Sequence, residues 1–91
     1  MGHWTFLTHH THVLLGLVKD PTMTVRELAM IVCLTERSVL KIIDDLVRAG
    51  VVAKKKVGRR NVYDVNLDTP LRQPLAKKGT IRDIVEALEI P

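Results

Sequence analysis

The sequence predicts one α+β domain built from three helices, a β-hairpin and an additional C-terminal helix. Three observations predict this fold class. Apolar residues recur at helical spacing in the first half of the chain, threonines stand where these segments begin, and a period-two alternation follows beside a cluster of cations. We expect one domain over residues 1–91, with a core over about 8–67, a connector over 68–79 and the last helix over 80–90.

The first helix is predicted over about residues 8–19, where four apolar residues share helical spacing: Val13, Leu14, Leu17 and Val18. It ends before Pro21, because the residue preceding a proline disfavours the helical conformation.

The second helix begins with a capping box. Thr24 is followed three residues later by Glu27, and each of these side chains can satisfy a backbone donor of the other. Its inner face is expected to consist of Leu28, Ala29, Ile31 and Val32.

The third helix is predicted to begin at Thr35 as its N-cap and to end at Gly50, which suits a left-handed C-terminal cap. Its inward residues are Val39, Ile43 and Leu46. Two residues, Cys33 and Leu34, separate it from the second helix. This gap is too short for two helices with parallel axes, so it predicts a helix-turn-helix with a sharp crossing.

A hairpin follows the third helix. The strands are expected over 51–53 and 62–67, with Tyr63, Val65 and Leu67 on one face and Tyr63 in the core. Gly58 supplies the positive φ that a hairpin tip needs. Between the strands stand five cations: Lys54, Lys55, Lys56, Arg59 and Arg60. Three helices and a basic hairpin together predict a winged helix-turn-helix, in which the hairpin is the wing.

The charge distribution favours a polyanionic partner. The chain carries 14 Lys and Arg against 10 Asp and Glu, with a pI near 9.6, and five of those cations fall within residues 54–60. With three aromatic residues, the chain does not favour a platform for stacking single-stranded bases.

The segment "TVRELAMIVCLTERSVLKIIDDLVRAGVVAKKKVGRRNVYDVN", residues 24–66, resembles the winged helix-turn-helix core of MarR-like and related prokaryotic transcriptional regulators. Its most specific parts are "LTERSVLKIIDDLVRAGVV" and "VGRRNVYDV". The resemblance covers about half of the chain. It implies a DNA-binding regulator, usually a homodimer, with the third helix in the major groove and the wing beside it. The chain departs from the pattern at Cys33, where glycine is frequent, and at Leu40, where a polar residue is more usual.

The residue types on the third helix suit a major groove. Arginine can pair with guanine and glutamate can accept from cytosine, while Ser, Thr and Lys suit base edges or phosphates. Asp44 and Asp45 repel phosphate, so the N-terminal half is expected to enter the groove. The expected DNA contacts are Thr35, Glu36, Arg37, Ser38 and Lys41, with Lys54, Lys55, Lys56, Arg59, Arg60 and Asn61 from the wing. The alternative is that these charges form a solvated helix face and a wing edge that discourages strand pairing.

Apolar residues at both ends have no place in a three-helix core, which predicts a dimer interface. Its expected residues are Trp4, Phe6, Leu7, Ile81, Ile84, Val85 and Leu88. The alternative is that the last helix folds back onto the first helix of its own chain. A second function therefore stays open, a protein-binding winged helix that uses these ends, and a third is RNA binding by the hairpin.

Metal binding and catalysis are not expected. His9, His10 and His12 cluster, but two imidazoles on one helix face do not complete a zinc site, and Cys33 has no second thiol nearby. No nucleophile–base spacing or phosphate-binding glycine loop is present, so we expect neither an enzyme nor a cofactor. A single cysteine and the lack of a long apolar run predict a cytoplasmic protein without a membrane span.

Overall fold

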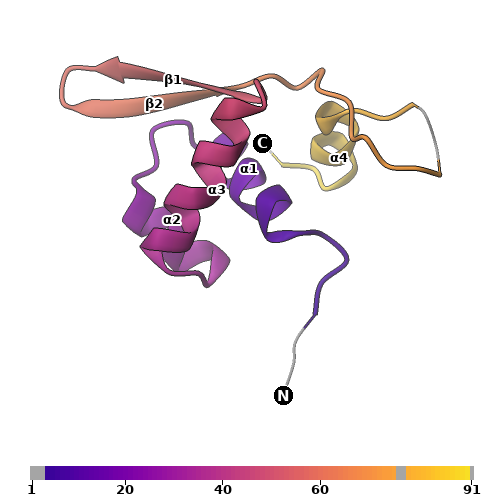
Figure 1. Cartoon of the computed structure of the whole chain (residues 1–91), viewed down its shortest axis with the longest axis horizontal. Coiled ribbons are helices and arrows are strands. Elements are labelled where there is room, and N and C mark those ends of the chain that lie inside the picture. Colours follow the sequence, from indigo (N-terminus) through magenta and orange to yellow (C-terminus); the bar gives the residue numbers. More distant parts are fainter. Residues whose placement is uncertain (1–3, 76–77, 91) are drawn as a thin grey trace.

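The structure is a computed structural model that describes residues 4–75 and 78–90. Three helices precede a two-stranded antiparallel sheet, and a fourth helix follows it (Figure 1). This is the winged-helix fold that the sequence predicts. The elements are α1 (His9–Lys19), α2 (Val25–Val32), α3 (Glu36–Arg48), β1 (Val52–Val57), β2 (Arg60–Val65) and α4 (Ile81–Ala87).

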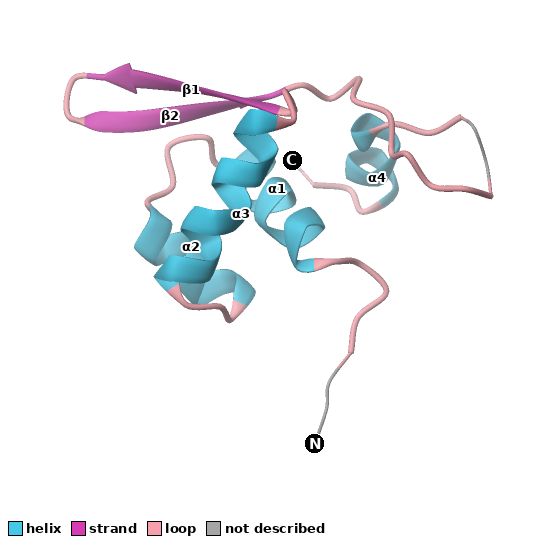
Figure 2. Ribbon diagram, viewed as in Figure 1, coloured by secondary structure: helices cyan, strands magenta, loops and turns pink. Residues whose placement is uncertain are grey.

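The hairpin and α4 lie on opposite sides of α3. Figure 2 shows the two strands crossing above the C-terminal end of α3 and extending to the left, while α4 lies to the right. The N-terminal segment before α1 extends away from the helices (Figure 1). No helix within the two described ranges is long and apolar enough to cross a membrane.

Threonine caps start the first three helices, and those of α2 and α3 were predicted. The Thr24 hydroxyl accepts a hydrogen bond from the Glu27 N–H at 3.1 Å, and the Glu27 carboxylate accepts from the Thr24 N–H at 2.9 Å. Thr8 caps α1 and Thr35 caps α3 in the same way, each through its hydroxyl. These bonds satisfy donors that a helix N-terminus would otherwise leave unpaired.

The predicted end of α3 is also confirmed. Gly50 has φ +78°, its N–H donates to the Val47 carbonyl, and the Val51 N–H donates to the Leu46 carbonyl. This paired arrangement is a Schellman motif, which turns the chain sharply at the end of a helix. It sends the backbone directly into β1.

The core forms where the first three helices meet the hairpin. Fully buried residues come from each helix, and Tyr63 of β2 is 4% exposed. The main buried members are Val13, Leu14, Leu17, Leu28, Ala29, Val39, Ile42, Ile43, Leu46, Val52 and Tyr63.

One inner-face prediction for α2 is wrong. Ile31 is 63% exposed, whereas Leu28 and Ala29 are buried and Val32 is half-buried. At 3.6 residues per turn, Ile31 lies roughly 110° from the centre of the face formed by Val25 and these three residues. It therefore points to solvent.

The hairpin is longer than predicted. The three lysines do not lie in a loop, since β1 includes them and pairs Lys54 with Tyr63, Lys55 with Val62 and Lys56 with Asn61. The connection shrinks to Gly58 and Arg59, with Gly58 at φ +63°. A two-residue turn of this kind matches the twist of the strands, so pairing continues to the tip and holds the lysines in extended chain.

Helix α4 folds back onto its own chain. The Ile81 N–H donates to the Thr69 carbonyl and the Arg82 N–H to the Leu67 carbonyl. Ile81 is buried in the core, and Val85 packs against this core. The helix ends earlier than predicted, because Glu89 adopts φ +54°. The fold-back onto the same chain, here through the connector and the core, therefore accounts for Ile81, whereas Val85 is only half-buried.

Candidate nucleic-acid interface

The face of α3 opposite the core carries the charges that the sequence suggested. Glu36, Arg37 and Lys41 are exposed, and so is Leu40 between them. Ser38 is half-buried. The inward residues of α3 fix this orientation, because they are buried along the whole length of the helix. The N-terminal half of α3 therefore presents a continuous, largely polar surface to solvent.

Thr35 serves the helix end itself. Its hydroxyl accepts from the Ser38 N–H at 3.0 Å and donates to the Ser38 hydroxyl oxygen at 2.9 Å. The proton of the Ser38 hydroxyl remains free to donate elsewhere. Of the two hydroxyl groups, that of Ser38 is the better placed for a further partner.

Asp45 contacts two basic side chains at once. Its Oδ1 lies 3.0 Å from Lys41 Nζ, one turn earlier on α3, and its Oδ2 lies 2.9 Å from His10 Nε2 on α1. These hydrogen bonds, first from His10 and then from Lys41, hold the pKa of Asp45 below its ordinary value. Lys41 is thus partly neutralised in the free protein. The pairing of Arg48 with Asp44 at 3.0 Å repeats the pattern further along.

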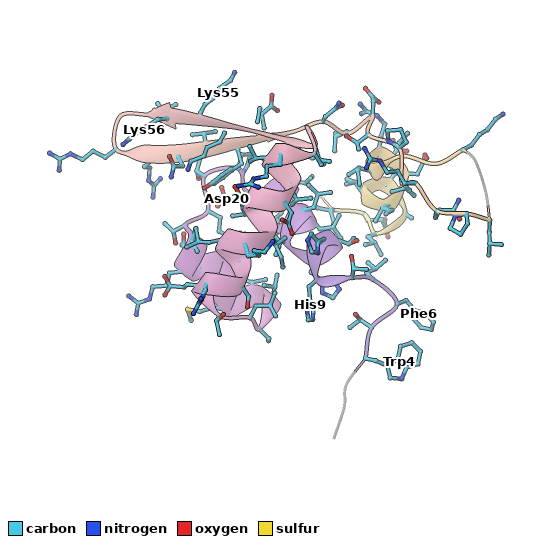
Figure 3. The ribbon with its side chains drawn as sticks, viewed as in Figure 1. Trp4, Phe6, His9, Asp20, Lys55 and Lys56 are labelled. Carbon is cyan, nitrogen blue, oxygen red and sulfur yellow. The ribbon has the colours of Figure 1, made fainter. Side chains whose placement is uncertain are left out.

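The wing lysines divide between two faces. Cross-strand partners lie on the same face of a sheet, so Lys54 shares a face with Tyr63 and Lys56 with Asn61. Lys55 lies on the other face, opposite Val62. Figure 3 shows Lys55 projecting upward, away from the helices. The cluster is therefore not a single cationic surface.

Arg60 lies beside acidic side chains of the body. Hydrogen bonds from Thr22 hold the pKa of Asp20 below its ordinary value, and the positive charge of Arg60 adds to this effect. Hydrogen bonds from Thr24 do the same for Glu27, again with a contribution from Arg60. Arg60 also lines a cavity with Thr22, Thr24 and Arg59. Of the two arginines expected between the strands, Arg59 lies in the turn, while Arg60 begins β2.

Tyr63 is a core residue, as predicted. Burial raises the pKa of its hydroxyl, and a hydrogen bond with the side chain of Asn61 acts in the opposite direction. The Tyr63 N–H donates to the Pro21 carbonyl at 3.0 Å. The wing is therefore anchored at its base to the segment between α1 and α2.

Sequence reasoning missed the partners of these cations. His10 pairs with Asp45 across 35 residues, and the charge of Arg60 acts on Asp20 and Glu27, which belong to other elements. Such contacts depend on how α1 crosses α3 and how the hairpin packs on α1 and the segment that follows it. Residue spacing along the chain carries no signal of either.

The apolar ends have mixed environments. Trp4 and Phe6 are 75% and 92% exposed and form an edge-to-face pair with ring centroids 4.8 Å apart. Figure 3 shows both rings on the N-terminal segment, away from the helices. Leu7, Ile84 and Val85 are half-buried, and Leu88 is exposed.

The fold and the α3 face define the class of protein to which this chain is similar. The chain resembles the solved structure of the zinc-dependent MarR family transcriptional regulator AdcR in its Zn(II)-bound state. The two share 26% sequence identity with a TM-score of 0.51, over 72% of this chain and 49% of the regulator. This chain therefore matches about half the length of that protein. No protein-family model matches the sequence, and neither does any curated protein.

The zinc dependence belongs to that regulator. Across residues 4–75 and 78–90, no group of three or more His, Cys, Asp or Glu side chains gathers as a metal ion would need. The rings of His9 and His12 are 6.4 Å apart and tilted. The donor set that the described residues offer does not fit a zinc site.

Proposed function

We propose that this protein binds double-stranded DNA in a sequence-specific manner, as a small homodimeric transcriptional regulator in the cytoplasm. The observation that carries the proposal is the exposed face of α3 with Arg37 and Lys41, on a winged-helix frame that also carries a cationic wing. The likeness to a transcriptional regulator, and not to an enzyme, supports it.

In this proposal, α3 enters the major groove by its N-terminal half. Arg37 is the candidate for a bidentate contact with guanine, and Glu36 for acceptance from cytosine. Lys41 and Ser38 contact backbone oxygens, and Thr35 contributes by ordering the helix end. Farther along α3, Asp44 and Asp45 keep the C-terminal half away from phosphate. Base reading is therefore confined to about two turns.

The wing supplies contacts that do not depend on sequence. Arg59 at the tip is the candidate for a contact in a minor groove. The phosphate backbone is the expected partner of the other wing residues, Lys54, Lys55, Lys56 and Asn61. Contacts of this kind release counterions, so binding weakens as salt rises. An RNA duplex offers the same charges, but its deep and narrow major groove does not admit a helix.

Dimerisation joins two weak half-site contacts. Two recognition helices about 34 Å apart enter successive major grooves on one face of the duplex. The candidate interface consists of Trp4, Phe6, Leu7, Ile84, Val85 and Leu88, now without Ile81, which is buried in its own chain. Linking the two contacts raises affinity without any new base contact.

A second candidate function rests on the exposed aromatic pair. Trp4 and Phe6 suit the anchor residues of a protein interface, in which large aromatics carry most of the binding energy. In that case the protein would be a protein-binding winged helix, with the wing cations serving solubility. The two functions differ in whether the protein binds duplex DNA in a salt-dependent manner.

The experiment is a titration of a duplex enriched from a random-sequence library, followed by fluorescence anisotropy at several salt concentrations. We expect salt-dependent binding, and we expect Arg37→Ala to cost about 1–3 kcal/mol on the enriched duplex. On unrelated duplexes, the same substitution should have a small effect.

Arg82→Ala is the matched control. It also removes one guanidinium, but Arg82 lies in α4, where it pairs with Asp68 at 3.2 Å. A chain that enriches no sequence and binds no duplex would refute the proposed function in favour of the protein-binding alternative. A loss of equal size on all duplexes would make Arg37 a phosphate contact.

A further inference from the structure

Leu40 is an apolar side chain in the middle of the charged face of α3. It is 54% exposed. The other large apolar residues of this helix point inward, including Val39 and Ile43 on either side of it in sequence. Its neighbours along the exposed face, one turn before and one turn after, are charged: Glu36, Arg37 and Asp44.

An exposed leucine is common on protein surfaces, so exposure alone decides nothing. What distinguishes Leu40 is its position relative to Arg37. It follows by three residues, about 4.5 Å further along the helix axis, whereas successive bases follow one another at about 3.4 Å along one strand. A helix that places Arg37 on one base edge therefore brings Leu40 to a base pair one or two steps away.

The major groove offers one apolar group on its base edges. This is the methyl group on C5 of thymine, while all the other features are hydrogen-bond donors and acceptors. A leucine can bury this methyl without leaving any polar group unpaired, whereas over other bases it covers a donor or acceptor that then loses its water. The chemistry of Leu40 matches this group alone.

We propose that Leu40 reads the C5-methyl group of a pyrimidine one or two base pairs from the base contacted by Arg37, and that this pyrimidine is thymine in unmodified DNA. The inference rests on the proposed function, because it requires α3 to lie in the major groove. Leu40 is then a specificity-determining residue and not a contributor to general affinity.

A protein partner on the same face is the competing explanation. Such a site needs a contiguous apolar patch. Along the exposed face of α3, charged side chains surround Leu40 on both sides, and Met30 and Ile31 expose their side chains from a different helix, α2. A single leucine within charges suits a groove of polar edges that presents one methyl group better than it suits an apolar protein surface.

The test removes the methyl group from the DNA and the leucine from the protein. The probe is the duplex enriched from a random-sequence library by the full chain, with each thymine of a half-site replaced in turn by deoxyuridine. This change keeps base pairing and removes one methyl. We expect one replacement to weaken binding about fourfold, the effect of burying one methyl-sized group. In Leu40→Ala, the same replacement should have no effect.

Ile31→Ala is the matched control, since it removes an exposed aliphatic side chain of the same size from α2. It should keep the fourfold effect. A second arm compares cytosine with 5-methylcytosine at the sensitive position. A gain from that methyl in the parent chain and none in Leu40→Ala supports a methyl contact independently of thymine.

The outcomes separate the inference from the proposed function. Tight, salt-dependent binding with no methyl effect at any thymine overturns the Leu40 assignment and leaves DNA binding intact. A methyl effect that persists in Leu40→Ala overturns it as well. If no duplex is bound, the proposed function fails and the Leu40 assignment fails with it.

Discussion

His10 of α1 and Asp45 of α3 contact each other through Nε2 and Oδ2 at 2.9 Å, although 35 residues separate them in sequence. The other carboxylate oxygen of Asp45 holds Lys41 at 3.0 Å. Asp45 therefore links the packing of two helices to a cation on the proposed DNA-binding face. A substitution of His10 should consequently affect both the packing of α1 on α3 and the pairing of Lys41.

The first prediction concerns this carboxylate. His10→Ala should raise the pKa of Asp45 towards its ordinary value, because the His10 hydrogen bond is the first cause of the lowering. A lowered carboxyl pKa stabilises the folded state above the unfolded pKa, near 3.9, and this stability is lost as the pH falls through the lowered value. His10→Ala should therefore make the loss of stability in acid less steep.

The measurement is the titration of the Asp45 carboxyl carbon by NMR between about pH 2 and pH 6, a range that spans the ordinary carboxyl pKa of about 3.9. Asp68 serves as the internal control, since it pairs with Arg82 beside α4. If the Asp45 titration were the same in the parent chain and in His10→Ala, the two side chains would not be coupled in solution.

The second prediction separates the two arginines of the wing. Arg59 occupies the two-residue turn, whereas Arg60 lies near Asp20 and Glu27. Arg59→Ala should flatten the slope of log K against log salt by about 0.9, the effect of one lost phosphate contact. Arg60→Ala should change the slope less, because its charge already interacts with the carboxylates of Asp20 and Glu27 in the free protein.

Both slopes come from anisotropy titrations of one unrelated duplex at several salt concentrations. Lys19→Ala, at the end of α1, controls for the loss of one positive charge. A larger change for Arg60 than for Arg59 would mean that Arg60 leaves its carboxylates on binding. Unchanged slopes in the double variant would remove the wing from the interface.

The third prediction concerns the turn between α2 and α3. Cys33 ends α2 in the left-handed conformation, at φ 59° and ψ 42°, where a side chain costs about 1–2 kcal/mol. Its thiol is exposed, so no buried contact is lost on substitution. Cys33→Gly should raise the free energy of unfolding by about 1 kcal/mol, which shifts the Tm of a small domain by about 4–8 °C.

Thermal unfolding followed by circular dichroism measures this effect. Cys33→Ala removes the thiol and keeps the Cβ, so it should leave the Tm near that of the parent chain. If the alanine and glycine variants gained equally, the thiol and not the backbone conformation would be the cause.

The fourth prediction concerns the crossing of α1 and α2. A Cβ added at Gly16 would meet Cδ1 of the fully buried Leu28. Alanine favours helix over glycine by about 1 kcal/mol, but overpacking of a core costs about 1–3 kcal/mol. Gly16→Ala should therefore lower the free energy of unfolding, although position 16 is helical. Urea unfolding measures this change. A double variant with Leu28→Val should recover part of the loss, and a stable single variant would mean that α1 shifts freely.

The local elements of the fold could be predicted from the sequence because their causes are local. Thr24 with Glu27, and Thr35 with Ser38, are capping partners within one turn, and Gly50 ends α3 through its own φ. The inward faces of α1 and α3 follow from helical spacing. Where spacing was applied to the short α2, it misplaced Ile31, since eight residues leave the apolar face poorly defined.

The candidate site was predictable in composition and not in arrangement. The sequence marks Arg37 and the wing cations as exposed charge, but it does not say that β1 extends through Lys56. Lysines disfavour strands by local preference, and it is cross-strand pairing with β2 that overrides this preference. The same holds for Ile81, whose place in the core depends on the path of the connector.

The last prediction is the dimer. Trp4, Phe6 and Leu88 expose apolar surface, and burying each such side chain stabilises an interface by roughly 1.5–3 kcal/mol before entropy. By light scattering at a protein concentration on the order of tens of micromolar, we expect the full chain to show twice the 10.3 kDa of one copy. This concentration detects a dimer whose Kd is about micromolar. Replacing Trp4 and Phe6 with serine, or Leu88 with aspartate, should shift the mass towards one copy.

Leu75→Ser is the control, because Leu75 is 95% exposed in the connector and lies outside the proposed interface. It should leave the mass unchanged. DNA binding gives a second reading, since a variant that is monomeric should bind a palindromic duplex about as weakly as a single half-site. A parent chain that runs as a monomer and binds both duplexes equally would refute the dimer, while the reading of bases by α3 would still stand.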